Sequence, residues 1–382
     1  MKTSRTIILF LCLVFLICSV SADGVGENWT LGTSSAGFPA RAGHAGLVFD
    51  NEAWILGGSS DNAATGLNDT WYSPDGIHWT EATSAAAFPG RFDFSALVFD
   101  GKMWIIGGFD GRNALNDVWY SGDGSTWTEA TASAGFPGRT AFASAVFNNR
   151  MWVFGGYDGN FPMSDVWSSA DGIHWTQANE SAAFGDRSGL SGAVFDNRIW
   201  AIGGSRGSTM LNDAWYSQDG IQWTEATPSA EFEPRAGQES PVYDNRMWVI
   251  GGTARDHILK DVWYSTNGTH WTEATPSAEF PGRFDFPALV LNDRIWVIGG
   301  AASNNSTVGS DAWYTSMTSS PAPSTAFASS MPPAGAGQVP WLWILAAIVV
   351  IAVVYTVFTV TRRPAAGTCG KKDSKKNRKK KR

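Results

Sequence analysis

The chain has 382 residues, of which 16% are charged and 13% are aromatic, and 20 of the aromatic residues are Trp. This composition excludes a disordered chain. The 42 glycines and the many aromatic residues favour strands and turns over a helical bundle, so we expect an all-β body.

The net charge of −7 is unevenly distributed along the chain. The last 21 residues carry +10 and the first 22 carry +2, which leaves −19 for the segment between them. Because so acidic a body repels the phosphate backbone, nucleic acid is excluded as a partner.

The first 22 residues have the pattern of a secretory signal. Lys2 and Arg5 precede an apolar stretch from residue 7 to 20, and Val20, Ser21 and Ala22 supply the small residues of a cleavage site. We therefore expect a signal peptide over residues 1–22 and a mature chain from Asp23. An uncleaved membrane anchor is the alternative.

Pairs of glycine recur along the body at 57/58, 107/108, 155/156, 203/204, 251/252 and 299/300, with steps of 50, 48, 48, 48 and 48 residues. The second unit shows the accompanying pattern: SALVFDGKMWIIGG, then NDVWYSGDG, then TWTEAT. A double Gly after an apolar strand, at a period near 50, resembles the kelch repeat, whose units are the four-stranded blades of a β-propeller. The resemblance covers residues 28–316 and implies one six-bladed propeller of kelch type within residues 23–316.

Each unit is expected to contain four strands, A to D. In the second unit, residues 96–99 and 103–106 are joined by the tight-turn dipeptide Asp100-Gly101, and a second such turn, Asp123-Gly124, leads into strand D. The nearly continuous apolar runs fit sheets that are covered on both faces.

The Trp pattern predicts how the ring closes. Strand D carries a Trp in only five units, at Trp79, Trp127, Trp175, Trp223 and Trp271. The missing Trp is matched by Trp29 in NWTLGT, one period before Trp79. We therefore predict that residues 28–33 supply strand D of the last blade and cover its open edge.

Two charged positions recur in every unit. An Arg follows a Phe by three residues at each junction from strand D to strand A, and an Asp precedes each strand C. The residues are Arg41, Arg91, Arg139, Arg187, Arg235 and Arg283, with Asp69, Asp117, Asp165, Asp213, Asp261 and Asp311. Charges present in every blade indicate architecture, so we expect them to pair with each other or with loop backbone. The alternative is an Arg-lined mouth that binds an anionic ligand.

The loops from strand B to strand C differ between units and are therefore the candidate ligand site. The resemblance implies the same face, because kelch propellers that bind peptides use their B-to-C and D-to-A loops. The candidate residues are Phe109, Asp110, Arg112, Tyr157, Asp158, Phe161, Arg206, Arg255, Asp256 and His257. Exposed rings there would stack on a sugar or anchor a peptide.

An enzyme is the less favoured interpretation, and no cofactor is indicated. His78, His174 and His270 occupy equivalent turns of different blades and cannot share a metal ion, which leaves only His44 and His257. The copper site of galactose oxidase, an enzyme with a kelch-like propeller, needs a Cys that this body lacks. A sialidase-like hydrolase remains the alternative, with Asp93, Asp285 and Glu239 as possible carboxylates that no spacing singles out.

Six sequons for N-glycosylation lie in the body, at Asn28, Asn68, Asn179, Asn267, Asn304 and Asn305. Residues 317–340 are rich in Ser, Pro and Ala and predict a flexible stalk.

The C-terminal segments predict a membrane anchor. Residues 341–360 contain no charge and would span a bilayer as a helix, and we place the transmembrane helix at residues 341–361. The basic residues 362–382 that follow would keep that side in the cytoplasm. Cys12, Cys18 and Cys369 all lie outside the body, so no disulfide is expected in it.

We therefore expect a single-pass plasma-membrane protein whose extracellular propeller binds a glycan or a protein. The alternatives are a membrane-anchored glycoside hydrolase or lyase, and a structural envelope component.

Overall fold

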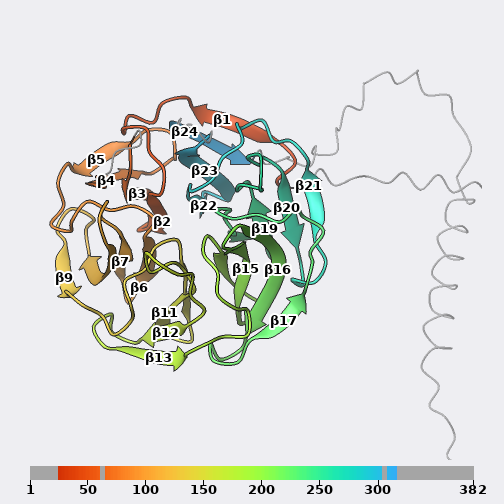
Figure 1. The fold of residues 1–382 in the computed structure, drawn as a ribbon. Coiled ribbons are helices and arrows are strands. Elements are labelled where there is room, and N and C mark those ends of the chain that lie inside the picture. The colour runs from red at the N-terminus through yellow and green to blue at the C-terminus, as the bar shows by residue number, and fades with distance from the viewer. Residues whose placement is uncertain (1–24, 61–64, 303–307, 316–382) are drawn as a thin grey trace, which may run out of the picture. The chain divides into compact units, whose positions relative to one another are not determined.

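The computed structural model describes residues 25–60, 65–302 and 308–315. They form 24 strands in six four-stranded sheets, which Figure 1 shows arranged around a central axis. The expected signal peptide, stalk, transmembrane helix and basic tail, and all three cysteines, lie outside the described residues. Within the described ranges, no helix is long and apolar enough to cross a membrane.

Five sheets are built from four consecutive strands each, in the order A to D. Blade 1 contains β2 (Ala45–Phe49), β3 (Glu52–Gly58), β4 (Leu67–Ser73) and β5 (Thr80–Thr83). Blade 2 contains β6 (Ser95–Phe99), β7 (Lys102–Phe109), β8 (Ala114–Ser121) and β9 (Thr128–Thr131). Blade 3 contains β10 (Ala143–Phe147), β11 (Arg150–Phe154), β12 (Val166–Ser169) and β13 (Trp175–Asn179).

The remaining blades repeat this order. Blade 4 contains β14 (Ser191–Phe195), β15 (Arg198–Arg206), β16 (Thr209–Ser217) and β17 (Thr224–Thr227). Blade 5 contains β18 (Val242–Tyr243), β19 (Arg246–Ile250), β20 (Val262–Ser265) and β21 (Thr272–Thr275). Blade 6 contains β22 (Ala288–Leu291), β23 (Arg294–Ala301) and β24 (Val308–Thr315), and its fourth strand is β1 (Trp29–Thr33).

The ring is closed by the two ends of the described body. β1 pairs antiparallel with β24, with Trp29 opposite Thr315 and Leu31 opposite Trp313, and Figure 1 shows the red first strand beside the blue last one. The Trp29 indole also donates to the Gly26 carbonyl at 3.1 Å, as Trp127 does to Gly124 at 3.0 Å in blade 2. The prediction that residues 28–33 complete the last blade is confirmed.

Burial is greatest in strand B. In β7 every residue from Met103 to Gly108 is buried, whereas β9 exposes Thr128 and Glu129. Because neighbouring blades cover both faces of strand B, its sequence is continuously apolar instead of alternating.

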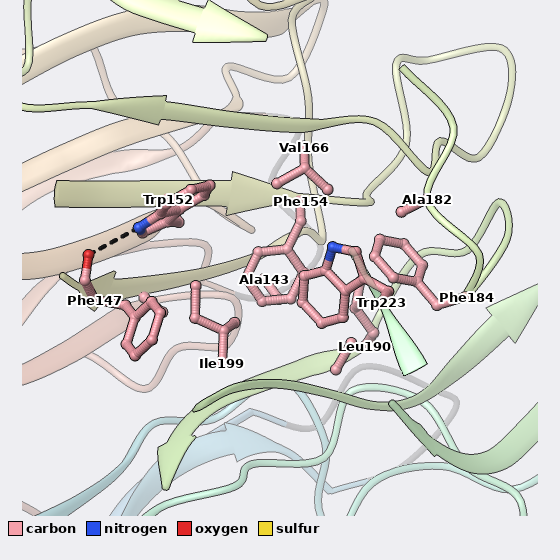
Figure 2. Packing of buried hydrophobic residues seen from close by; sticks show 12 residues of the cluster. Ala143, Phe147, Trp152, Phe154, Val166, Ala182, Phe184, Leu190, Ile199 and Trp223 are labelled. Atoms are coloured by element: carbon pink, nitrogen blue, oxygen red, sulfur yellow. Dashed lines mark hydrogen bonds between the residues drawn. The ribbon is translucent and has the colours of Figure 1, made fainter. Parts of the chain in front are cut away.

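The core therefore lies between blades, as Figure 2 shows for blades 3 and 4. Phe184 meets Trp223 edge-on, with ring centroids 4.9 Å apart and an interplanar angle of 87°. Phe154 packs against the same indole at 5.3 Å, and the Trp152 indole donates to the Phe147 carbonyl at 2.9 Å. Edge-on aromatic pairs add about 0.5–1.5 kcal/mol beyond the burial of their area.

A second contact between blades involves the tight turn before each strand D. This turn places a glycine against the strand-B Trp of the preceding blade, and a Cβ at Gly124 would lie 2.0 Å from the Trp54 ring. Only glycine permits so close an approach. The six pairs are Gly76–Trp296, Gly124–Trp54, Gly172–Trp104, Gly220–Trp152, Gly268–Trp200 and Gly26–Trp248.

Candidate functional site

The strand order gathers the candidate loops at one end of the propeller. Strands A and C begin, and strands B and D end, at the same side of every blade. The B-to-C and D-to-A loops therefore share this side, which we call the loop face. The tight A-to-B and C-to-D turns form the opposite turn face.

The repeated arginines form a buried framework beneath the loop face. Arg91 donates from Nη1 and Nη2 to the two carboxylate oxygens of Asp117, each at 2.7 Å, and from Nη1 to the Gly107 carbonyl at 2.9 Å. Its guanidinium lies 5.8 Å from the Phe88 ring centroid. The same Asp accepts the Trp119 indole N–H at 2.7 Å.

All six blades contain this arrangement. The shortest nitrogen-to-oxygen distances are Arg41–Asp69 2.6 Å, Arg91–Asp117 2.7 Å, Arg139–Asp165 2.9 Å, Arg187–Asp213 2.7 Å, Arg235–Asp261 2.7 Å and Arg283–Asp311 2.8 Å. The arginine side chains are at most 3% exposed. The pairing expected from the sequence is present, and the alternative of an Arg-lined mouth is wrong because these side chains are buried and engaged.

Two residues after each repeated Arg, the backbone forms a closed ring around the axis, which we call the axial ring. Each of its residues donates its N–H to the carbonyl of the equivalent residue in a neighbouring blade. The bonds are Gly43 to Asp285 2.8 Å, Asp93 to Gly43 2.8 Å, Ala141 to Asp93 3.0 Å, Gly189 to Ala141 2.8 Å, Gly237 to Gly189 2.9 Å and Asp285 to Gly237 3.1 Å.

All six residues of the axial ring have a left-handed backbone, with φ between 49° for Ala141 and 64° for Gly237. Glycine adopts this conformation freely, and Asp tolerates it better than most residues do. The ring therefore selects small residues or Asp, and its glycines leave the axis open.

A cavity on the axis opens at this ring and has two parts. An upper chamber of about 110 Å³ is lined by the axial ring and the residues that follow it, including Phe94, Phe142 and Phe286. A lower chamber of about 210 Å³ extends along the first residues of strands A and includes Ser95, Ser144 and Ser191. His44, Phe94, Phe142, Leu190, Gln238 and Glu239 line both chambers.

Three carboxyl groups face this cavity: Asp93, Asp285 and Glu239. Each keeps part of its surface accessible while protein surrounds the rest. Burial raises the pKa of Asp93 to about 6 and that of Glu239 to about 8. Burial, followed by the charges of Asp93 and Glu239, raises the pKa of Asp285 well above its usual range. The structure thus brings together three carboxylates that the sequence left scattered.

Two polar residues occupy positions that are apolar in the other blades. The residue after each ring position packs against the first Gly of the preceding blade's pair, as Phe94 does against Gly57. His44 and Gln238 replace the apolar side chain in blades 1 and 5. Burial and the positive charge of Arg41 hold the pKa of His44 well below its usual range, so its ring is neutral.

The blade 5 strand A is interrupted beside Glu239. Its ladder with β19 is limited to Val242 and Tyr243, because Pro241 has no N–H to donate. Glu239 therefore lies before the regular strand, at the wall of the cavity.

The candidate loop of blade 2 is held by its own Asp. Asp110 accepts the backbone N–H groups of Arg112 and Asn113, each at 2.7 Å, while the Arg112 side chain is exposed. Phe109 is at the end of β7 and packs edge-on against Phe92, with centroids 5.5 Å apart.

The loop of blade 3 repeats this geometry and presents an aromatic ring. Asp158 accepts the N–H groups of Asn160 and Phe161, each at 2.7 Å. Phe161 is 71% exposed, the most exposed large apolar side chain of the described residues. Tyr157 is half-buried, and its backbone forms isolated β-bridges with Thr140 and Pro162.

The loops of blades 4 and 5 are more engaged with the protein. The Arg206 guanidinium donates to the Asp186 carbonyl at 3.3 Å and to the Phe184 carbonyl at 3.4 Å. His257 contacts Asp256 at 2.8 Å and Glu233 at 3.3 Å. These contacts raise the pKa of His257, with the bond to Asp256 as the largest cause. Arg255 is exposed.

Each candidate loop thus contacts the D-to-A loop that leads into strand A of the same blade. Among the described residues, no hydrogen bond or ring contact joins candidate residues of different blades. Sequence analysis missed the axial ring and Gln238. The available signal was the residue two positions after each repeated Arg, which is Gly, Ala or Asp in every unit.

The three turn histidines lie on the turn face. His78 is 83% exposed on its side chain and contacts Asp75, which also accepts the Ile77 and His78 N–H groups. His174 and His270 are equally exposed. No cluster of three or more His, Cys, Asp or Glu that could hold a metal ion is found in the described part of the chain.

The described sequons differ in accessibility. Asn28 and Asn267 are exposed. The Asn68 amide donates to the Ala86 carbonyl at 2.9 Å, and the Asn179 amide donates to Ile221 at 2.8 Å. Asn304 and Asn305 lie outside the described residues.

Comparison with known proteins agrees with this architecture. A family model described as the KLHDC2/KLHL20/DRC7 Kelch-repeats domain matches residues 120–300. A second model, the DUF6242 beta propeller domain, matches residues 17–170. No curated protein matches the chain significantly.

Proposed function

We propose that this body, a six-bladed propeller of the kelch type, is a recognition module that binds an extracellular protein or glycan through its loop face. Kelch-type architecture in general supports a binding role, although fold by itself does not assign a function. The observation that carries the proposal is that the repeated residues and the variable loop residues of the loop face have different environments. The repeated charges satisfy one another, whereas three variable loops expose side chains to solvent, namely Arg112, Phe161 and Arg255.

The blade 3 loop is the strongest anchor for a partner. Asp158 fixes the backbone of the loop, and Phe161 extends from it at 71% exposure. A ring held in place before binding loses little conformational entropy when a partner covers it. Aromatic and Arg side chains also provide most binding hot spots, and Arg112 and Arg255 are exposed on the same face.

We further propose that the propeller is displayed at the plasma membrane by a single pass. The signal pattern of residues 1–22, the uncharged segment 341–360 and the basic residues 362–382 support this arrangement. The stalk predicted for residues 317–340 would hold the propeller off the membrane.

Glycoside hydrolysis is a second candidate because Asp93, Asp285 and Glu239 line one cavity. Two carboxyl groups with different pKa values are the usual catalytic pair of glycosidases. Hydrolysis of a panel of aryl glycosides that disappears in Glu239→Gln and Asp93→Asn would favour this candidate over simple binding.

The recognition proposal is tested with the full-length protein on glycan and peptide arrays. We expect specific binding that falls at least tenfold when Phe161, Arg112 and Arg255 are all changed to Ala. The matched control changes two exposed turn-face residues, Ile173 and Ile221, which are 47% and 42% exposed, and should bind like the parent. Loss of binding in the control but not in the loop-face variant would contradict the proposal. A folded protein with no ligand on either array would shift support to the hydrolase or to an envelope component.

A further inference from the structure

The axial cavity is the feature of the loop face that the recognition proposal leaves unused. It is separate from the variable loops, because its walls come from the axial ring and from the start of each strand A. Its polar groups are mostly acceptors of hydrogen bonds, and Arg and Lys are missing from the described residues that line the two chambers.

The carboxyl groups are held over glycines of the axial ring. A Cβ at Gly43 would lie 2.5 Å from Asp93 Oδ1, and a Cβ at Gly237 would lie 2.7 Å from Asp285 Oδ1. These distances place each carboxylate over the neighbouring blade's ring position. Among the described residues, neither carboxylate accepts a hydrogen bond from a side chain.

Gln238 adds a buried polar side chain with one unsatisfied atom to the cavity wall. Its side chain is buried, at 3% exposure, and Nε2 donates to the Ile202 carbonyl at 2.9 Å and to Ser191 Oγ at 3.2 Å. Ser191 lines the lower chamber, so the amide lies at the chamber wall. Its Oε1 has no hydrogen-bond partner, and a buried acceptor without a partner costs about 1–3 kcal/mol.

We propose that the axial cavity binds an alkylammonium group, such as the end of a lysine side chain presented by a bound partner. The ammonium head supplies three N–H donors, one for each of the carboxyl groups of Asp93, Asp285 and Glu239. Its methylene stem lies along the apolar wall that Phe94, Phe142 and Leu190 contribute. This inference deepens the proposed function and rests on it, because the cavity opens on the same face.

The charge of the site favours this ligand over an anion or a metal ion. Three carboxylates around one cavity repel anions, and their mutual repulsion is relieved when a cation enters. The described carboxylates do not converge closely enough to form a metal-binding cluster, whereas an ammonium head bonds oxygens at about 2.7–3.2 Å, farther than the roughly 2.0–2.6 Å of a Mg²⁺ or Ca²⁺ ligand.

Binding should depend on pH because the carboxyl groups must be ionised. The titratable groups at the cavity are Asp93, Asp285, Glu239 and His44, and the nearby cations are Arg41 and Arg283, which lie beside His44. Alkylammonium groups stay protonated below pH 10. Affinity should therefore rise by at least tenfold between pH 6 and pH 9.

The test is isothermal titration calorimetry of the full-length protein with Nα-acetyl-lysine methylamide, whose ε-ammonium is free, and with 1,4-diaminobutane, each at pH 6 and pH 9. Acetyl-norleucine methylamide is the matched neutral probe. We expect both cations to bind at pH 9 and the neutral probe to bind at least tenfold more weakly. Tighter binding of the lysine amide supports a partner's side chain, and tighter binding of the diamine supports a free polyamine as the source of the group.

Two variants separate the site from the fold. Asp93→Asn with Asp285→Asn should remove binding, and Asp93→Gly with Asp285→Gly should do the same while keeping a backbone that glycine already adopts at Gly43, Gly189 and Gly237. Glu129→Gln removes an exposed carboxylate on the outer strand of blade 2, outside both candidate sites, and should bind like the parent. Thermal melting confirms that each variant is folded.

The proposal is overturned if no cation binds at pH 9 at concentrations up to about 10 mM, if the neutral probe binds equally well, or if the Asp variants bind like the parent. If the protein binds an array ligand in a Phe161-dependent way but binds no cation, the proposed recognition function is supported and this inference is refuted. Cation binding without any macromolecular ligand would give the opposite result.

Discussion

Glu279 accepts a hydrogen bond from the Trp29 backbone N–H at 2.8 Å across 250 residues of sequence. The bond fixes the first strand to the loop that leads into the last blade. Glu231 makes the same bond to Trp271 at 2.8 Å, within blade 5. The N-terminal strand is therefore held by side-chain contacts that an internal strand D also uses.

Trp29→Ala should destabilise the whole propeller, although the residue is near the start of the body. Trp29 is 4% exposed, and removing a buried Trp side chain costs about 3–5 kcal/mol. Urea denaturation followed by circular dichroism measures the loss. Leu31→Ala on the same strand is the control, since Leu31 is 44% exposed. Equal stability of the Trp29 variant and the parent would mean that β1 does not close the ring.

Loss of one repeated Arg should be as damaging as loss of a core residue. Arg139→Ala leaves Asp165 buried without its partner, which costs about 3–5 kcal/mol. Arg139→Lys should not restore stability, because Lys cannot bond both Asp165 oxygens and the Gly155 carbonyl from one planar group. The control, Arg112→Ala, should change the free energy of unfolding by less than about 0.5 kcal/mol. Rescue by Lys would show that charge alone matters at this position.

Ala141→Gly should stabilise the protein by about 1 kcal/mol. Ala141 has a φ of 49°, and a left-handed backbone costs a residue with a Cβ roughly 1–2 kcal/mol, part of which is offset by the greater freedom of Gly in the unfolded chain. The reverse change, Gly189→Ala, should be destabilising, because φ there is +62° and the new Cβ would lie 3.1 Å from the Ala236 Cβ. Melting temperatures of the two variants should shift in opposite directions.

Glu239→Gln should remove a pH-dependent loss of stability. The folded pKa of Glu239 is about 8, above the ordinary value of 4.5, so the folded state binds the proton more tightly than the unfolded state. The contribution of Glu239 to the free energy of unfolding is therefore fully present below pH 4.5 and is lost as the pH rises toward 8. The variant should match the parent near pH 4.5 and be more stable by about 1 kcal/mol or more at pH 9.

The control for this pH effect is Glu129→Gln, which changes an exposed carboxylate on the outer strand of blade 2 and should leave the pH profile unchanged. Parallel melting curves for the parent and Glu239→Gln from pH 5 to pH 9 would contradict the assignment.

The fold could be predicted because each blade carries its own local signals. The Gly pairs, the Asp-Gly turns and the Trp of strand D repeat in register, and the one missing Trp pointed to Trp29. Each of these signals lies within one unit of about 50 residues, so it can be recognised in the sequence without knowledge of contacts between distant segments.

The axial cavity could not be predicted in the same way. Asp93 and Asp285 are far apart in sequence, and only closure of the ring places both beside Gly43. Their shared RFDF motif gave no direction for the side chains. Glu239 was harder still, because it faces the cavity beside an interruption of strand A that Pro241 causes. The strand order predicted that the candidate loops share one face, but the contact of Arg206 with the Phe184 carbonyl depends on loop conformation.

The axial ring also constrains the number of blades in the propeller. Each blade supplies one N–H and one carbonyl to a cycle of six bonds that has no beginning and no end. A duplicated unit would have to widen the cycle, and a deleted unit would have to contract it, in either case without the present hydrogen-bond lengths. Copy number is thus set at the axis by the bond geometry of the backbone.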